Sequence, residues 1–313
     1  MNVTLGPARE DSVLETELVT RSMGGHLTLR VATPVGDGDR AEHDLYTVAA
    51  RIQAWAEQLT RFNPDSDLSA LNAEPEATAV ALRPTIAAVL SHARAMTPRA
   101  EGAVDVTLLD ERLAAETGEP AARTDRPSWQ LDDIGRSSVL FRHGRVRFDL
   151  DGVAKGWLAD RALRLLDGYR CALVDADGDI AVRAPHDSGW RVAVGHPFAD
   201  KTQIAWLGFP AARPLHSFGV ATSGTSVHRW RGRDGAAHHL IDPLTGRPAV
   251  TDVVQATVVA ESAAVAECLA KAAVIRGSEA GSGLLERAGA YAALLWLEDG
   301  QLAMTPGTSG WLD

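Results

Sequence analysis

Three segments of this 313-residue chain combine glycine with charged side chains in spacings that suit phosphate or metal chemistry. In the first, FDLDGVAKGWLAD (148–160), the pattern predicts a strand that turns through Gly152 and enters a helix carrying Lys155. Free backbone N–H groups at a helix start favour phosphate, and a lysine adds positive charge. The GxxxxGK[ST] spacing of a P-loop is absent, so the segment alone is also typical of an ordinary strand–turn–helix joint.

The second segment, VDADGDI (174–180), places acidic residues around Gly178 after an apolar strand. Carboxylates of Asp175, Asp177 and Asp179 are the oxygen ligands that a hard cation prefers. The spacing of an EF-hand does not continue beyond them, so an acidic turn without a cation is the alternative interpretation.

The third segment, VATSGTSVHRWRGRDGAAHHLIDPLTGRPA (220–249), offers hydroxyls and backbone amides at a TSGTS turn, and His239 three residues before Asp242. Histidine is the usual general base near neutral pH. The structural alternative is a pair of surface histidines followed by a DPLTG turn.

A fourth segment, VAECLAKAAVIRG (265–277), predicts a helix with Glu267 and Lys271 one turn apart. Side chains at i and i+4 lie on one helix face. The pair is therefore either an ordinary surface ion pair or a place where an enzyme would hold a metal.

The spacing of apolar residues predicts the elements that position these segments. We expect strands at 25–33, 171–184, 189–197 and 253–262, and helices at 41–62, 84–97, 152–168 and 265–277. Hairpins are expected through His143-Gly144 and Asp299-Gly300, and the polar stretch 110–133 indicates a surface insertion. Strands and helices do not alternate strictly, which favours an α+β fold over a doubly wound α/β fold.

Composition narrows the class of protein. The net charge is −10 and basic residues are dispersed, which argues against a nucleic-acid or anionic-membrane surface. Cys171 and Cys268 lie in apolar surroundings and are expected to be buried, reduced thiols. No apolar run reaches the roughly 18 residues of a membrane helix, so we expect a cytoplasmic protein with a flexible tail at 1–19 and one domain at 20–313.

Taken in order, these segments resemble those of the ApbE family of flavin transferases. Further stretches carry the likeness, which extends from about residue 20 to 305: SMGG (22–25), TRFNPDSDLSALNA (60–73), GAVDVT (102–107), HHLIDPLTGRPA (238–249) and VVAESAAVAECLAKA (258–272). The resemblance implies an α+β fold of mixed sheets and packed helices, in two lobes with the flavin site between them.

The resemblance also implies an activity. Family members bind FAD and, with magnesium, move its FMN half to a Ser or Thr hydroxyl of a target flavoprotein, releasing AMP. Carried over, His239 and Asp242 would be catalytic, and the metal would be held by the Ala154 carbonyl, Glu267 and Lys271. The residues implied around FAD are Met23, Phe62, Ala103, Val104, Asp105, Thr107, Asp151, Lys155, Trp157, Asp179 and Leu240.

Several positions depart from the family pattern. Glu267 stands for an aspartate, which keeps a carboxylate, but Lys271 stands for a threonine, and an ammonium has no lone pair to donate. Lys271 could point away, could replace the metal's charge and bind the phosphate, or could mark a lost site with a surface salt bridge. Asp151 replaces a glycine, Phe62 a tyrosine and Asp175 a frequent asparagine.

Three functions are therefore open at this stage. The first is an FAD:protein FMN transferase. The second is an FAD-binding protein with a degenerate metal site, and the third is an FAD pyrophosphatase in which water replaces the acceptor hydroxyl. Magnesium dependence separates the first from the second, and the fate of FMN separates the first from the third.

Overall fold

The fold is built on one large antiparallel sheet. The computed structural model describes residues 13–118, 128–199, 202–210, 216–226, 229–232 and 235–313. The sheet has the strand order β1-β2-β6-β7-β10-β15-β16-β17, and every neighbouring pair is antiparallel. Its strands are β1 (Val13–Ser22), β2 (Gly25–Pro34), β6 (Cys171–Ala176), β7 (Asp179–Ala184), β10 (His216–Gly224), β15 (Val253–Ala260), β16 (Ala292–Leu297) and β17 (Leu302–Met304). This antiparallel sheet with packed helices confirms the α+β prediction.

Burial along the strands follows their place in the sheet. In β2, Leu27, Leu29 and Val31 are buried and alternate with more exposed residues, as expected near an edge. Every residue of β6 is buried, because both faces of the sheet are covered there.

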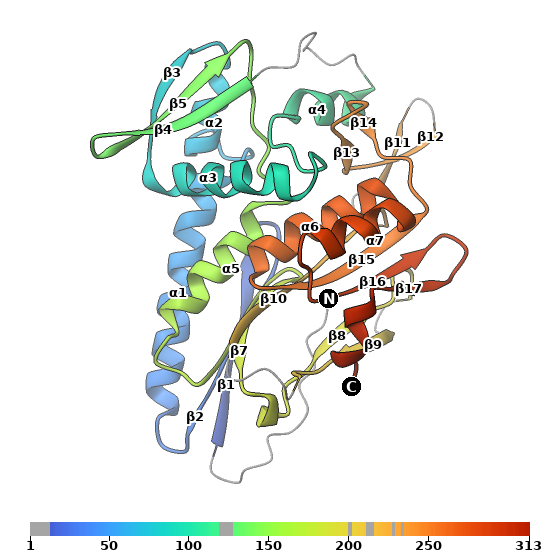
Figure 1. Ribbon diagram of the computed structural model, residues 1–313. Helices are drawn as coiled ribbons and strands as arrows, with labels where there is room; N and C mark the ends of the chain where they lie inside the picture. Colours follow the sequence, from blue (N-terminus) through green and yellow to red (C-terminus); the bar gives the residue numbers. More distant parts are fainter. Residues whose placement is uncertain (1–12, 119–127, 200–201, 211–215, 227–228, 233–234) are drawn as a thin grey trace.

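Helices cover one face of the sheet, with α1 (Gly38–Leu59), α5 (Ala154–Leu165) and α6 (Ala263–Arg276) packed side by side against it (Figure 1). In α1 the buried residues recur every three or four positions, which gives it one apolar face. In contrast, α6 is buried almost all round, because it lies between the sheet, α5 and α7 (Ser278–Arg287).

The opposite face of the sheet carries a smaller core. Trp190, Leu207 and Trp311 pack there against Phe218 and Val220 of β10. This layer includes the two-stranded sheet of β8 (Val192–Gly195) and β9 (Gln203–Leu207).

The remaining elements lie at one end of the molecule, in the upper part of Figure 1. They are α2 (Asp67–Ala73), α3 (Pro84–Arg99), α4 (Leu109–Thr117), the sheet β3-β5-β4 (Ala79–Leu82, Ser137–His143, Ser128–Ile134), and the pairs β11-β12 (Arg229–Gly232, Gly235–His238) and β13-β14 (Ile241–Asp242, Arg247–Pro248). Short 3-10 helices occupy His186–Ser188 and Pro306–Gly310. None of the described helices is both long and apolar enough to cross a membrane.

Two glycines allow the start of α6 to pack closely against its neighbours. A Cβ atom at Gly156 would overlap the Ala263 carbonyl, and one at Gly219 would overlap the backbone of Ala263. The carboxylate of Asp160 on α5 accepts the amides of Ala263 and Ala264, both at 2.9 Å. These contacts fix α6 against α5, and so fix Glu267 one turn further along.

Several expected elements are borne out. The strands expected at 25–33 and 253–262 are β2 and β15, the helices at 41–62, 84–97, 152–168 and 265–277 are α1, α3, α5 and α6, and the hairpin at Asp299-Gly300 joins β16 to β17. Cys171 and Cys268 are both free and buried, as expected.

Other expectations need correction. The tail expected at 1–19 is too long, since residues 13–19 belong to β1 and pair with β2, while 1–12 lie outside the described residues. The hairpin expected at His143-Gly144 instead turns at Gly135, because β5 pairs with β4 and not with the segment that follows it. The stretch 110–133 is not only a loop, since it contains most of α4 and most of β4. The strand expected at 171–184 is two strands, and Thr222 to Gly224 end β10 instead of forming a turn.

Candidate active site

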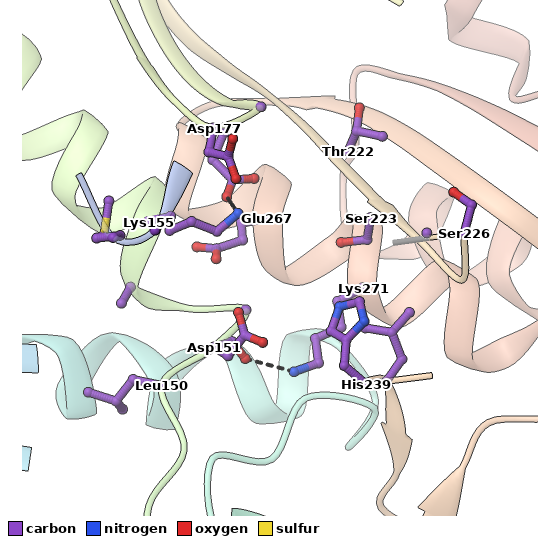
Figure 2. A pocket seen from close by; sticks show the side chains of 18 of the residues that line it. Leu150, Asp151, Lys155, Asp177, Thr222, Ser223, Ser226, His239, Glu267 and Lys271 are labelled. Atoms are coloured by element: carbon purple, nitrogen blue, oxygen red, sulfur yellow. Dashed lines mark hydrogen bonds and ion pairs between the residues drawn. The ribbon is translucent and has the colours of Figure 1, made fainter. Parts of the chain in front are cut away.

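A cavity of about 1360 Å³ lies where the ends of β10, α1 and α4 meet the start of α5 and the side of α6 that carries Glu267 and Lys271. It brings together most of the residues predicted from the sequence. Those that line it are Met23, Phe62, Asp151, Ala154, Lys155, Asp179, His239, Leu240, Glu267 and Lys271. They come from six segments that are far apart in the sequence, so only the fold places them together (Figure 2).

Two tight turns form one side of the cavity. Met23 and Gly24 join β1 to β2 with φ of 52° and 81°, and Asp177 and Gly178 join β6 to β7 with φ of 60° and 94°. Successive residues with positive φ are typical of two-residue hairpin turns, where glycine is favoured. The two turns touch, because the His26 amide donates to the Asp177 carboxylate at 3.3 Å.

The three alternating aspartates point to different partners and do not form a cation site. Asp175 accepts the Gly178 amide at 2.7 Å, Asp177 accepts the His26 amide, and Asp179 pairs with Lys155. Within the described ranges, no group of three or more His, Cys, Asp or Glu side chains could hold a metal ion. The acidic-turn interpretation of 174–180 is therefore the one that the structure supports.

Lys155 forms a nearly buried ion pair on the cavity wall. Its Nζ lies 2.8 Å from Oδ2 of Asp179, and the two side chains are 27% and 3% exposed. Burial alone would lower the pKa of Lys155, but the negative charges of Asp179, Glu267 and Asp151 outweigh burial and raise it. Lys155 therefore stays a cation inside the cavity at all physiological pH values.

Glu267 is buried and not part of a surface salt bridge. Its Oε2 accepts the Gly156 amide at 2.9 Å, while Oε1 has no hydrogen-bond partner among the described residues. Burial, together with the charge of Asp179, raises the pKa of Glu267 well above its usual range.

Lys271 points away from Glu267, although both project from the same side of α6. Its ammonium donates to the backbone carbonyl of Asp151 at 2.8 Å, and its chain crosses over Gly152 (Figure 2). In the part of the chain that the structure describes, no ion pair joins Lys271 to a carboxylate. The surface ion pair between Glu267 and Lys271, one of the alternatives from the sequence, is therefore not formed in the described part of the chain.

The metal site implied by the resemblance does not fit this donor set. It would consist of the Ala154 carbonyl, one buried carboxylate and Lys271, whose ammonium cannot donate a lone pair and repels a divalent cation. Magnesium favours oxygen ligands, commonly one or two carboxylates. Glu267 is the only carboxylate of the implied set.

Arg112 organises a charged network that sequence reasoning missed. Its guanidinium donates to the carboxylate of Asp151, lies 3.3 Å from Asp149, and donates to Glu116 at 3.0 Å. Burial would raise the pKa of Asp151, but the charges of Arg112, Lys271 and His239 lower it. Arg112, Glu116, Asp149 and Asp151 all line the cavity. Arg112 lies in the stretch 110–133, for which the sequence predicted only a polar surface insertion.

The two adjacent histidines have different surroundings. His238 is buried, its Nδ1 accepts the Leu240 amide at 3.3 Å, and its Nε2 lies 3.0 Å from the Ala249 carbonyl. An amide donor at Nδ1 and a carbonyl at Nε2 require the neutral tautomer with its proton on Nε2, which fixes His238 as a structural residue. His239 instead lines the cavity.

Phe62 lies at the cavity with 79% of its surface exposed. The guanidinium of Arg61 covers its ring at 4.2 Å from the centroid, and Arg61 also pairs with Glu116 at 3.2 Å. An aromatic ring exposed at the cavity is suited to stacking on a planar ligand.

Comparison with known proteins identifies the family. A family model described as the ApbE family matches residues 23–295 of this chain. The chain belongs to the ApbE family. It is 26% identical to the FAD:protein FMN transferase of Treponema pallidum, with 96% of this chain and 89% of that protein covered. It is 27% identical to the FAD:protein FMN transferase of Vibrio cholerae, over 74% of this chain and 72% of that protein.

Solved ApbE structures show the same fold. The flavin transferase ApbE from Vibrio cholerae superposes with a TM-score of 0.72 at 23% identity, covering 96% of this chain and all of that one. The ApbE protein from Thermotoga maritima gives a TM-score of 0.75 at 22% identity, covering 94% and 97%. The predicted ApbE-like fold is thus confirmed.

Six residues implied by the ApbE likeness do not line the cavity: Asp242, Ala103, Val104, Asp105, Thr107 and Trp157. The Asp242 carboxylate accepts the Leu244 amide at 3.0 Å and lies 3.8 Å from Arg276, so it shapes the DPLTG turn. Ala103 and Val104 are core residues, and Asp105 accepts the amide and hydroxyl of Thr107. Trp157 packs edge-on against Trp55 of α1, with ring centroids 6.2 Å apart.

The 103–107 segment nevertheless supports the cavity from behind. The Val106 carbonyl accepts the Asp149 amide at 2.8 Å, which attaches this ApbE motif to the turn that carries Asp151. Its residues therefore act on the cavity by holding the wall in place.

Asp175 gives a pH-dependent prediction at this site. Burial, aided by the charges of Asp179 and Asp177, raises the pKa of Asp175 to about 6 despite the Gly178 amide. The folded state therefore holds this proton up to about pH 6, whereas the unfolded chain loses it near pH 4, so stability from this group falls as pH rises between these values. Asp175→Asn keeps an acceptor for the amide and removes the charge. We expect the free energy of unfolding to rise by about 1–3 kcal/mol at pH 8 and by much less at pH 4.

Urea unfolding of both proteins at the two pH values measures this difference. An equal effect at both pH values would show that the gain comes from packing and not from the charge of Asp175.

Proposed function

We propose that this protein is an FAD:protein FMN transferase, which moves FMN from FAD to a Ser or Thr hydroxyl of a target flavoprotein and releases AMP. The observation that carries the proposal is that Lys155, His239 and Lys271, from three separate segments of this ApbE-family chain, line one cavity beside an exposed aromatic ring. A cavity of about 1360 Å³ has room for a dinucleotide.

Each group has a separate task in this proposal. Phe62 stacks on the flavin ring, with its other face held by Arg61. Lys155, a cation at neutral pH, offsets the charge of the pyrophosphate. The start of α5 beside it offers backbone N–H groups that favour a phosphate oxygen.

The chemistry is an in-line displacement at phosphorus. The acceptor hydroxyl oxygen attacks the FMN phosphorus, an O–P bond forms, and the bond from this phosphorus to the bridging oxygen breaks, so that the bridging oxygen leaves with AMP. His239 takes the hydroxyl proton. Binding both reactants in one cavity lowers the entropic cost of bringing them into line.

No step is assigned to a metal ion. The resemblance implies magnesium, but the donor set of Ala154, Glu267 and Lys271 does not fit it, because the ammonium of Lys271 has no lone pair to donate. The proposed transfer therefore relies on the positively charged side chains of the cavity for phosphate charge.

One incubation tests the proposed function. Purified full-length protein, FAD and a peptide with an acceptor threonine are mixed, and AMP, free FMN and peptide mass are measured, with a threonine-to-valine peptide as the control. AMP together with a peptide that gains the mass of an FMN group, only when the threonine is present, is the expected result.

Two other outcomes would replace this proposal. AMP with an equal amount of free FMN and no adduct in any peptide would indicate an FAD pyrophosphatase. If the protein binds FAD and leaves it intact, it is an FAD-binding protein without transfer activity. The presence of Lys271 in place of a metal ligand favours that alternative.

A further inference from the structure

Lysine is rare in this chain, and most of its few lysines lie at the cavity. The sequence contains only three lysines, Lys155, Lys201 and Lys271, among many arginines. Two of these three line the cavity. A lysine carries a compact, strongly hydrated ammonium on a flexible stem, whereas arginine presents a wide planar fork, so the two cations are not equivalent in a narrow phosphate site.

The positively charged side chains of the described cavity wall pair with carboxylates, with one exception. Arg112 offsets the carboxylates of Asp149 and Asp151, and Lys155 offsets Asp179. Lys271 contacts a neutral backbone carbonyl instead, and it is the one lysine or arginine of the described cavity wall that pairs with no carboxylate of the described residues. Its charge also acts on the nearby Asp149 and Asp151, but only one of its three N–H donors is used by the Asp151 carbonyl, so donors remain for an anion in the cavity.

The surroundings of Lys271 hold it near the start of α5. Its side chain crosses Gly152, and a Cβ at Gly152 would lie 2.7 Å from its Nζ, so a larger residue there would displace the end of the lysine side chain. The Asp151 carbonyl that accepts its proton belongs to the same turn. Asp151 and Lys271, which both depart from the family pattern, are thus in contact. The Asp151 side chain bonds to Arg112, whereas its backbone carbonyl bonds to Lys271.

We propose that Lys271 binds the pyrophosphate of FAD directly and supplies the positive charge that a divalent cation would otherwise bring, so that this protein binds FAD without magnesium. This inference rests on the proposed function for the identity of the ligand. The ammonium of Lys271 has three N–H donors and uses one of them for the Asp151 carbonyl. It can therefore donate to a phosphate oxygen while it keeps that hydrogen bond.

The test is FAD binding, measured by quenching of flavin fluorescence with the full-length protein, in buffer with excess EDTA and in buffer with magnesium. Wild-type protein should bind FAD with the same Kd, within about twofold, in both buffers. Lys271→Met keeps the aliphatic stem and removes the charge, and it should weaken FAD binding by about 10- to 100-fold in EDTA, the usual effect of losing a charged hydrogen bond. Lys271→Arg should retain most of the affinity.

Riboflavin, which has no phosphate, is the internal control. Its Kd should be the same for wild type and Lys271→Met, which shows that the variant is folded and its flavin site intact. Arg136→Met, which removes one exposed positive charge from the β4–β5 turn, should leave both Kd values unchanged and so excludes a general effect of net charge.

Lys271→Thr tests the exchange of an ammonium for a metal. We expect weak FAD binding in EDTA that improves at least about tenfold with magnesium, because a hydroxyl beside Glu267 replaces the repelling cation. Isothermal titration of this variant with magnesium in the presence of FAD should show binding that wild-type protein lacks.

Two results would overturn the inference. Wild-type FAD binding that is lost in EDTA and restored by magnesium would show that a metal carries the charge, and an unchanged FAD affinity in Lys271→Met would show that Lys271 does not touch the phosphates. If neither FAD nor riboflavin binds wild-type protein in any buffer, the proposed function fails, which is a different result from either of these.

Discussion

Replacing His239 with alanine should lower the rate of FMN transfer by about 100- to 10,000-fold and leave the Kd for FAD within about threefold of wild type. His239 lines the cavity that holds Lys155 and Lys271, and its charge contributes to lowering the pKa of Asp151 in the same cavity. A hydroxyl group is a poor nucleophile until it loses its proton, and a positioned imidazole removes that proton in the transition state. The single-turnover rate of adduct formation at saturating FAD measures the chemical step separately from binding.

The neighbouring His238 provides the matched control. Its ring nitrogens are both used by the backbone, at the Leu240 amide and the Ala249 carbonyl, so His238→Ala should lower the melting temperature more than His239→Ala does. The transfer rate per folded molecule of His238→Ala should stay closer to wild type. Transfer by His239→Ala within tenfold of the wild-type rate would show that another group is the base, and loss of FAD binding would assign His239 to the ligand instead.

The elements with regular periodicity could be predicted from the sequence. The alternation of Leu27, Leu29 and Val31 gives β2, and the three-to-four spacing of Leu45, Val48 and Ile52 gives α1. These local patterns record which face is buried, which is the main information that a single sequence carries about structure.

The errors concern pairings that no local pattern specifies. His143-Gly144 is a good turn dipeptide, yet β5 pairs with β4, which precedes it, and with β3, which is distant in the sequence. Strand β1 was not predicted because one of its faces is largely polar. It is also an edge strand, which pairs with β2 alone in the sheet. Strand pairing is set by tertiary packing, so the turn signal alone could not decide between the two hairpins.

The candidate site divides in the same way. Lys155, His239, Glu267 and Lys271 could be predicted as site residues because each lies in a local motif that is recognisable by the spacing of its residues. The motifs could not show that Lys271 bonds to the Asp151 carbonyl or that Arg112 pairs with Asp149 and Asp151, since these contacts join segments far apart in the chain. They also could not separate residues that line the cavity from those that support it, such as Asp105 and Asp242, because both groups share the same family motifs.

Replacing Lys155 with methionine should destabilise the fold by about 3–5 kcal/mol, toward the lower end of that range because the Lys155 side chain keeps 27% of its surface exposed. Its partner Asp179 has a side chain that is only 3% exposed, so removal of the ammonium leaves a buried carboxylate without its counter-charge. The raised pKa of Lys155 shows that these negative charges outweigh the burial of its ammonium. Equilibrium unfolding in urea at neutral pH measures the loss.

The double variant Lys155→Met/Asp179→Asn separates the cost of an unpaired charge from the loss of packing. A neutral amide at position 179 no longer needs a counter-charge, so most of the lost stability should return, while FAD binding should remain weak in both variants because the cavity has lost a phosphate-binding cation. A double variant no more stable than Lys155→Met would show that the lysine stem, and not the ion pair, supports the fold. FAD affinity equal to wild type in the stable double variant would remove Lys155 from the phosphate site, and Lys271 would then be the remaining lysine that could neutralise the pyrophosphate.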